Sequence, residues 1–181
     1  NSYFLDIPVE KHKEIINLIV VHGDRLFSYS ENEKCIKVWD LKSFICIKDI
    51  DLSPFWDDAK MNGSFMGIYE NELFLRVKNK ILFFNVKSFE LIKIVPWHED
   101  GGIGSKIYTV LINGSFYSYW KMIGINVSKN TEIAVSNADT GEKTNFFKIG
   151  QVDFQHLSDA GDNMLAVCAG SEIQLWDVKS G

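Results

Sequence analysis

A stretch of nine residues, Ile36–Phe44, returns three more times along the chain and limits the fold more than any other feature. In each copy an alternating apolar segment, typical of a half-buried strand, ends in a pair of residues and a short polar tip. Repetition at about 40 to 50 residues is typical of a protein built from similar units of several short strands. The copies begin at Ile36, Ile81, Ile133 and Ile173, which are 45, 52 and 40 residues apart.

The pair of residues that ends each alternating segment is the most regular part of the repeat. Three copies have an aromatic residue followed by an acid or an amide, and the third copy keeps only the amide. A polar tip and another apolar segment follow each pair, as expected for strands joined by tight turns in an antiparallel meander. The pairs are Trp39-Asp40, Phe84-Asn85, Ser136-Asn137 and Trp176-Asp177.

The repeats divide the chain into four units within a single region, residues 1–181. We place the units at approximately 2–44, 45–89, 90–141 and 142–181. Strand candidates occur throughout, and helical periodicity is confined to Val9–Asn17. The sequence therefore predicts an all-β repeat protein.

Two segments carry more specific predictions. Leu18–Val21 is a continuous apolar run, which is the pattern of a strand buried on both faces. In the third unit, Ile107–Leu111 and Phe116–Trp120 are both candidate first strands, because Asn113-Gly114 between them favours a hairpin turn. We place Ile123–Ser128 after them as the second strand, so that an additional strand accounts for the 52-residue spacing.

The composition narrows the classes of partner. The 181 residues are 46% hydrophobic and 13% aromatic, which is enough apolar surface for a folded core. A net charge of −5, with the lysines spread over different repeats, argues against a nucleic-acid partner. No apolar run approaches the roughly 18 residues of a membrane span, so we expect no membrane association.

Three cysteines are an odd number and a poor framework for disulfides. On a hairpin that turns near residues 42 and 43, we expect Cys35 opposite Ile50 and Cys46 opposite Trp39, which is out of register for a bridge. Buried, reduced thiols indicate a cytoplasmic protein. Asn-X-Ser sequons at Asn62, Asn113 and Asn126 are about as many as chance gives, so they decide nothing about secretion.

Four-strand units of this period, each with Trp-Asp or a substitute at the end of the third strand, resemble the WD repeats of the β-propeller family. The resemblance covers nearly the whole chain. It implies a fold of antiparallel four-stranded blades, about four in number. It also implies that the aromatic residues Trp39, Phe84 and Trp176 pack between blades and that the following acid or amide supports the turn. Propellers of this family act mainly as rigid platforms for proteins and peptides.

The chain departs from the family pattern in two ways. No Gly-His dipeptide opens the first strands, and the third unit has lost its aromatic residue. The family builds a side-chain hydrogen-bond network from that histidine with an aspartate, a serine and the tryptophan. We therefore expect this network to be incomplete here, and the blades to be held more by apolar packing than by polar bracing.

Catalytic and metal-binding motifs are absent from the sequence. His98-Glu99-Asp100 is the densest cluster of titratable residues. Neither of the metal-binding motifs His-Glu-x-x-His and Cys-x-x-Cys is present. We therefore interpret the cluster as a solvated acidic loop and predict no metal or cofactor. Gly101–Ser105 is glycine-rich without a following helix to hold a phosphate. No Gly-x-Ser-x-Gly elbow supplies a nucleophile, so no catalytic residue is predicted.

The remaining candidates are residues for recognition. Loops that precede the innermost strands of such a fold gather on one face, and two of these loops carry large aromatic side chains. Aromatic residues are enriched at the energetic centres of interfaces. Phe55, Trp56, Trp97 and His98 are therefore hypothetical partner-binding residues, and the alternative is that the aromatic rings fold back to pack their own loops.

These observations favour a non-catalytic scaffold that binds a protein or peptide on the loop face. One alternative is an enzyme that uses the propeller as a scaffold, with carboxylates near the central axis. Another is the substrate-receptor propeller of an F-box type ubiquitin ligase, which rests on family analogy alone. About 180 residues supply fewer units than a full ring of the family, so we favour an open arc whose free edges support self-association. Pairing of Ser2–Asp6 with Glu172–Asp177 would instead close the ring.

Overall fold

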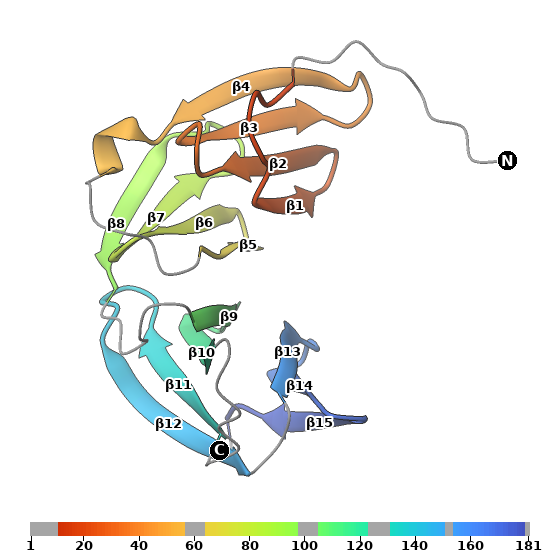
Figure 1. Ribbon diagram of the computed structural model, residues 1–181, viewed down its shortest axis with the longest axis vertical. Helices are drawn as coiled ribbons and strands as arrows, with labels where there is room; N and C mark the ends of the chain where they lie inside the picture. The colour runs from red at the N-terminus through yellow and green to blue at the C-terminus, as the bar shows by residue number, and fades with distance from the viewer. Residues whose placement is uncertain (1–10, 57–63, 98–104, 123–130, 151–153, 180–181) are drawn as a thin grey trace, which may run out of the picture. The chain divides into compact units, whose positions relative to one another are not determined.

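The computed structural model describes residues 11–56, 64–97, 105–122, 131–150 and 154–179 of the chain. Within these ranges it contains strands, turns and a single 3₁₀ turn, η1 (Ser53–Phe55), as Figure 1 shows. The chain divides into two compact units, Asn1–Asp58 and Ala59–Gly181, called unit 1 and unit 2 below. No helix among the described residues is long and apolar enough to cross a membrane.

Unit 1 contains one antiparallel sheet in which strands that are neighbours in sequence are also neighbours in space. The order is β1-β2-β3-β4. The strands are β1 (Leu18–His22), β2 (Arg25–Ser30), β3 (Cys35–Asp40) and β4 (Ile45–Asp51).

Unit 2 contains three sheets of the same kind, in the orders β5-β6-β7-β8, β9-β10-β11-β12 and β13-β14-β15. The first strand of the middle sheet, β9, lies beside both β5 and β13, so the first strands of the three sheets are neighbours. Consecutive meanders packed through their first strands are β-propeller blades, which confirms the expected fold class. The bounds are β5 (Met66–Tyr69), β6 (Glu72–Val77), β7 (Lys80–Asn85), β8 (Leu91–Pro96), β9 (Ser105–Ile112), β10 (Ser115–Met122), β11 (Thr131–Asn137), β12 (Lys143–Gly150), β13 (Phe154–Asp159), β14 (Met164–Ala169) and β15 (Glu172–Asp177).

The turn after the third strand is built in the same way in successive blades. The side-chain oxygen of Asp40 accepts the backbone N–H groups of Lys42 and Ser43, at 2.9 and 2.8 Å. Asn85 and Asn137 accept the corresponding pairs of N–H groups, and Asp177 accepts that of Lys179. The expectation that the acid or amide supports this turn is therefore confirmed. The fourth residue after it has a positive φ in three blades, namely Phe44 (58°), Phe89 (62°) and Gly141 (73°).

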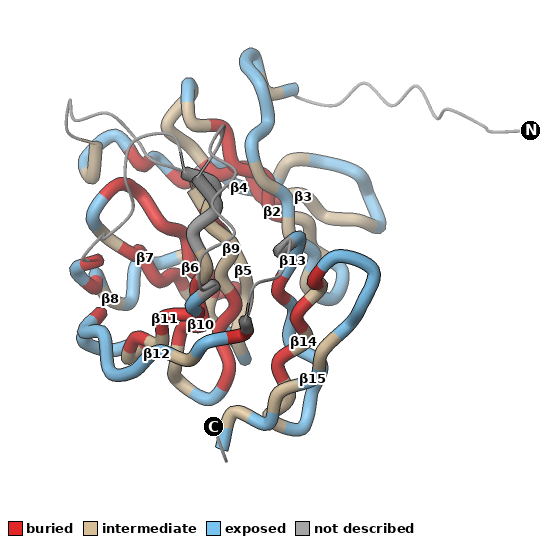
Figure 2. Tube along the Cα trace, turned by 60° about the horizontal axis from the view of Figure 1, so that its bottom comes forward, coloured by how far each residue is buried: buried red, intermediate tan, exposed pale blue. Residues whose placement is uncertain are grey.

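Unit 2 has an aromatic core between its first two sheets. Phe116 of β10 is fully buried, and its ring centroid lies 5.4 Å from that of Phe74 and 6.2 Å from that of Phe83. The middle strands β6 and β7 are buried along most of their length, whereas the outer strand β8 is largely exposed, as the colours of Figure 2 show. A second cluster joins the middle and last sheets through aliphatic residues of β9, β11, β14 and their neighbours.

The structure corrects the expected strands of the third unit. Phe116–Trp120 belongs to β10, which pairs with β9 on one side and with β11 on the other, so it is the second strand of its sheet rather than an additional first strand. The extra length of this repeat comes from β9 and β10, which are longer than β5 and β6, and from the connection between β10 and β11, which has eight residues where that between β6 and β7 has two. Ile123–Ser128, expected as a strand, lies outside the described residues, and so does the Ser2–Asp6 segment, whose pairing with Glu172–Asp177 would close the ring.

Two expectations for unit 1 are also wrong. Ile19 and Val21 of β1 are 65% and 55% exposed, so this strand is not buried on both faces despite its continuous apolar sequence. Cys35 pairs with Asp51 instead of Ile50, because an irregularity between Val38 and Trp39 shifts the register by one residue. The other expected pair, Trp39 with Cys46, is present, and the three cysteines are free and half-buried rather than buried.

Candidate functional site

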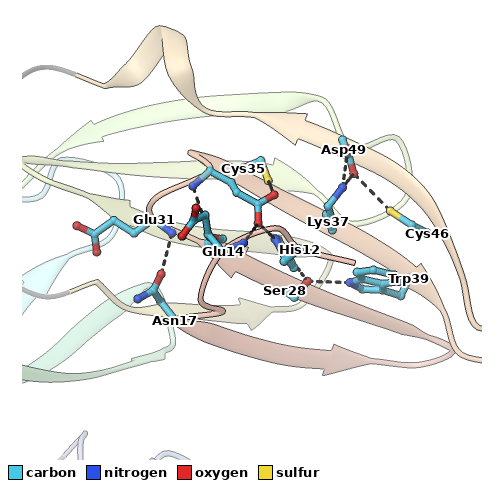
Figure 3. Close-up of polar contacts among 12 residues, drawn as sticks. His12, Glu14, Asn17, Ser28, Glu31, Cys35, Lys37, Trp39, Cys46 and Asp49 are labelled. Carbon is cyan, nitrogen blue, oxygen red and sulfur yellow. Dashed lines mark hydrogen bonds and ion pairs between the residues drawn. The ribbon is translucent and has the colours of Figure 1, made fainter. Parts of the chain in front are cut away.

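A chain of side-chain hydrogen bonds crosses the sheet of unit 1 and ends at the turn between β2 and β3 (Figure 3). The indole nitrogen of Trp39 lies 2.7 Å from Ser28 Oγ, which lies 2.7 Å from Nε2 of His12. The other ring nitrogen of His12, Nδ1, lies 3.0 Å from a carboxylate oxygen of Glu33. The backbone N–H of Glu14 donates to the same oxygen at 2.9 Å.

The direction of these hydrogen bonds follows from the chemistry of the groups. An indole N–H only donates, so Ser28 Oγ accepts from Trp39 and its own hydroxyl hydrogen is free to point at Nε2 of His12. A neutral imidazole that accepts at Nε2 carries its hydrogen on Nδ1, and that hydrogen is donated to the Glu33 carboxylate. Every member of the chain is thereby satisfied, although Ser28 is almost fully buried.

This network corrects the expectation that the polar bracing of the family pattern is incomplete. In unit 1 it contains all four kinds of group, with Glu33 in place of an aspartate and with His12 preceded by Lys11 rather than by glycine. His12 lies six positions before the first residue of β1, where no dipeptide motif marks it. The sequence signal that could have indicated this network is Ser28, a strand serine eleven residues before Trp39, together with Glu33, the acid in the turn between them.

No sheet of unit 2 has both a tryptophan that matches Trp39 and a serine that matches Ser28. Trp176 of the last sheet matches Trp39, and Ser118 of the middle sheet matches Ser28. The register places Phe84 opposite Leu73 and Trp176 opposite Leu165, and Trp39 is opposite Leu26 in the same way. The positions that match Ser28 are then Leu75 and Val167, both fully buried. Ser118 of the middle sheet bonds to Thr109 instead. The indole nitrogen of Trp176 donates to Gln174 of its own strand, at 3.3 Å. The described residues of unit 2 therefore lack the four-membered network of unit 1 and pack mainly through apolar clusters, as expected.

Glu33 is the charged end of the network. Burial acts to raise the pKa of Glu33, but the backbone N–H of Glu14 and the contacts with His12 outweigh it and hold this pKa below its ordinary value of 4.5. A carboxyl group whose pKa is lowered by folding stabilises the folded state at pH values above its unfolded pKa. This contribution is lost as the pH falls through the folded-state pKa.

We therefore expect Glu33→Gln to lower the free energy of unfolding at pH 7 by about 1 kcal/mol, and the difference from the unchanged protein to shrink toward pH 3. Urea unfolding at pH 7, 5, 4 and 3 measures both quantities. Glu90→Gln, at an exposed turn position, is the matched control and is expected to show a small effect at every pH. A difference for Glu33→Gln that is constant with pH would contradict the proposed role of its carboxylate.

The aromatic pair Phe55 and Trp56 lies at the same end of unit 1 as Glu33. Both side chains are partly exposed and follow Leu52, which is fully buried and whose N–H donates to the carbonyl of Lys34 at 2.8 Å. The N–H groups of Phe55 and Trp56 close the η1 turn onto Leu52 and Ser53. The ammonium of Lys34 lies 5.7 Å from the centroid of the Trp56 ring, within the range of a cation–π contact.

We call this surface the loop end of unit 1 and define it by His12, Glu33, Lys34, Cys35, Phe55 and Trp56. It joins two of the sequence-predicted recognition residues to the hydrogen-bond network. The aromatic pair is held by backbone hydrogen bonds at a fixed place, which lowers the entropy cost of using it in recognition.

Trp97, the third predicted recognition residue, is part of the core of unit 2. Its side chain is 3% exposed, and its ring lies 5.6 Å from Phe65 and 5.7 Å from Phe116, in edge-to-face contacts. The alternative that this ring packs its own loop therefore describes Trp97. His98 lies outside the described residues.

Polar and thiol groups line the face of β3 and β4 beside the network. Lys37 donates to both carboxylate oxygens of Asp49 at 2.9 and 2.8 Å, and the thiol of Cys46 lies 3.3 Å from the same carboxylate. The Cys35 thiol lies 3.8 Å from Glu33 Oε2. Burial, with the nearby Glu33 charge, raises the pKa of Cys35 to about 11, so this thiol is protonated at neutral pH.

One group of residues in the described part of the chain could hold a metal ion. The donor atoms of His12, Glu33 and Cys35 all lie within 4.8 Å of one another. Carboxylates on the first strands of the four sheets, β1, β5, β9 and β13, are by contrast limited to Asp159, which is exposed.

Comparison with known proteins finds no matching family model and no match among curated proteins. Solved structures do match. The computationally designed Ika8 protein is 14% identical, with a TM-score of 0.58 over 94% of this chain and 48% of that one. Hydrazine synthase of Kuenenia stuttgartiensis is 12% identical, with a TM-score of 0.52 over 81% of this chain and 41% of that one.

Hsv2 of Kluyveromyces lactis is 12% identical, with a TM-score of 0.50 over 90% of this chain and 61% of that one. The chain thus spans less than two thirds of the length of each of these structures. At identities this low the likeness concerns the arrangement of the backbone. It supports the β-propeller fold.

Proposed function

We propose that the chain is a non-catalytic interaction platform of WD-repeat type that binds a protein or peptide at the loop end of unit 1. The observation that carries this proposal is the pair Phe55 and Trp56, two partly exposed aromatic side chains on a turn closed by backbone hydrogen bonds. Rigid aromatic residues bury a large area at low entropy cost, which is why they are enriched at the centres of interfaces.

The charge around the aromatic pair favours a partner with both apolar and polar groups. Lys34 lies over Trp56 on one side, and Glu31 and Glu33 belong to the same turn. Charged groups of both signs around the aromatic rings orient a bound partner and give specificity, whereas the rings themselves supply most of the binding free energy. A peptide or a protein loop with an apolar side chain between polar neighbours fits this surface.

The alternative of a propeller-based enzyme receives less support. Such an enzyme would need convergent carboxylates near the first strands, and in the described ranges these strands contain only Asp159. The other residues of these strands that could act as a general acid or base are histidines, tyrosines and a lysine, with no carboxylate beside them on these strands except Asp159. They are His22, Tyr69, Lys106, Tyr108 and His156. We therefore keep the interaction platform as the conclusion.

Trp56→Ala is expected to weaken binding of the partner by about 1 to 3 kcal/mol without lowering the thermal stability of the protein. The measurement uses a photo-crosslinking amino acid at position 55 to capture the partner from lysate, followed by titration of the identified partner with unchanged and substituted protein. A crosslinker at Ile92, which is 45% exposed on β8, is the matched control for nonspecific capture.

Lys42→Ala supplies a second control, because Lys42 lies on the exposed tip after β3 and is expected to change neither binding nor stability. Equal capture from positions 55 and 92 would contradict the proposal. Unchanged affinity of Trp56→Ala for a partner captured at position 55 would also contradict it.

A further inference from the structure

His12, Glu33 and Cys35 bring three different metal-binding groups together from three segments of unit 1. His12 comes from the chain before β1, Glu33 from the turn between β2 and β3, and Cys35 from the first position of β3. His12 Nδ1 lies 3.0 Å from Glu33 Oε1, and Cys35 Sγ lies 3.8 Å from Glu33 Oε2. The side chain of His12 is 2% exposed, that of Glu33 is 15% exposed and Cys35 is half-buried, so the three donors are largely shielded from bulk water.

These separations are close to those around a tetrahedral zinc ion. Zinc binds imidazole nitrogen and carboxylate oxygen at about 2.0 to 2.2 Å and thiolate sulfur at about 2.3 Å. At a tetrahedral angle the nitrogen and oxygen are then about 3.3 Å apart, and the oxygen and sulfur about 3.5 Å apart. The observed 3.0 Å joins Nδ1 to Oε1 and the observed 3.8 Å joins Sγ to Oε2, the other oxygen of Glu33, so an ion bound to one oxygen requires the carboxylate or the thiol to turn. Each distance differs from its tetrahedral value by a few tenths of an ångström. Side-chain rotation alone covers such a difference.

Two of the three donors, His12 and Glu33, are already oriented by hydrogen bonds from neighbouring groups. Ligating histidines and carboxylates are usually fixed by a hydrogen bond from their other polar atom, and these partners contribute strongly to affinity. The second ring nitrogen of His12 is held by Ser28, which Trp39 holds in turn. The backbone N–H of Glu14 orients the carboxylate of Glu33.

We propose that this cluster binds a divalent transition-metal ion of the zinc class, through His12 Nδ1, the Glu33 carboxylate and Cys35 Sγ. A set of one nitrogen, one oxygen and one sulfur donor suits zinc or cobalt and is a poor match for calcium or magnesium, which prefer oxygen donors only. Three protein ligands leave one tetrahedral position for water or for a group of a bound partner. The site belongs to the loop end, but it does not depend on the proposed function.

Binding of the ion rearranges the protons in a defined way. The thiol of Cys35 loses its proton to solvent and binds as thiolate. His12 loses the hydrogen on Nδ1 and takes one on Nε2, so the imidazole stays neutral and now donates to Ser28 Oγ. Ser28 then accepts from both Trp39 and His12, and its own hydroxyl hydrogen turns away. One proton is released in total for each ion bound.

Cobalt(II) alone is the probe for the experiment, because thiolate coordination gives it a charge-transfer absorption band that water or carboxylate coordination lacks. The full chain is titrated with cobalt under reducing conditions, and zinc affinity is then measured by displacement. We expect the band in the unchanged protein and in Cys46→Ser and Cys168→Ser, the matched controls at the other two thiols. We expect no band in Cys35→Ser, and a zinc affinity reduced about 10- to 100-fold in Ser28→Ala.

Two outcomes would overturn the proposal. One is a saturating titration of the unchanged protein that gives no thiolate band. The other is a band that persists in Cys35→Ser, which would place the ion at another cysteine. Circular dichroism of each variant checks its fold, and His12→Gln serves as an independent ligand variant if Cys35→Ser fails to fold. Calorimetry in buffers of different ionisation enthalpy should give about one proton released per zinc bound.

Discussion

Gly141→Ala is expected to lower the free energy of unfolding of unit 2 by about 2 to 4 kcal/mol. Gly141 has a φ of +73°, and a Cβ at this position would lie 1.8 Å from the carbonyl oxygen of Pro96, the last residue of β8. A backbone atom cannot move aside as a flexible side chain does, so the turn after β11 must shift away from β8. Urea denaturation followed by tryptophan fluorescence measures the loss.

Gly114→Ala is the matched control for this experiment. Gly114 has nearly the same φ, +72°, but a Cβ there would meet nothing within 4 Å. This substitution is therefore expected to cost only the backbone strain, about 1 kcal/mol. Equal losses in the two variants would show that the contact with Pro96 adds nothing, and would contradict the packing of the turn against β8.

Trp97→Ala is expected to destabilise unit 2 by about 3 to 5 kcal/mol, because it opens a cavity among aromatic rings that have little freedom to collapse. Trp97 lies against Phe65 and Phe116, and Phe116 is fully buried. Trp97→Phe keeps most of the apolar contact and is expected to cost less than about 1.5 kcal/mol. Thermal unfolding and urea denaturation measure both variants.

Phe146→Ala is the control for removal of an aromatic ring from unit 2. Phe146 is 51% exposed on β12, so its loss is expected to change stability by no more than about 0.5 kcal/mol. If Trp97→Ala proved as mild as Phe146→Ala, the ring would not belong to the core, and a role of Trp97 in recognition would have to be considered again.

The repeat could be predicted from the sequence because its signals are local. Alternating apolar residues specify a strand, and an acid or amide at the end of the third strand specifies the turn by accepting the next N–H groups. Asp40, Asn85 and Asn137 all do this, even though the residue before Asn137 is a serine rather than an aromatic. The fold class and most strands followed from these two signals.

The failures concern contacts between residues that are distant in sequence. His12 joins Ser28 and Glu33 across 16 and 21 positions, and no local pattern indicates such a contact. The burial of Trp97 likewise depends on Phe65, 32 positions earlier in the chain, and on Phe116 of the next sheet. In the third unit the hairpin turn was identified correctly, but assigning β10 as second strand required knowledge of its pairing with β11.

The repeated turn after the third strand has a consequence for how freely its sequence can vary. One side-chain oxygen and one left-handed backbone position hold the turn in each of these blades. In the first blade the hydroxyl of Ser43 also donates to Asp40, at 3.0 Å. The first intervening residue is buried in two blades, as Val86 and Ala138, and must stay apolar. Substitutions at the next two positions, which are exposed, are expected to have small effects, whereas a one-residue insertion would break the spacing between Asp40 and Phe44. In protein engineering terms, each blade tip offers two exposed positions at which a library of constant length can vary the sequence.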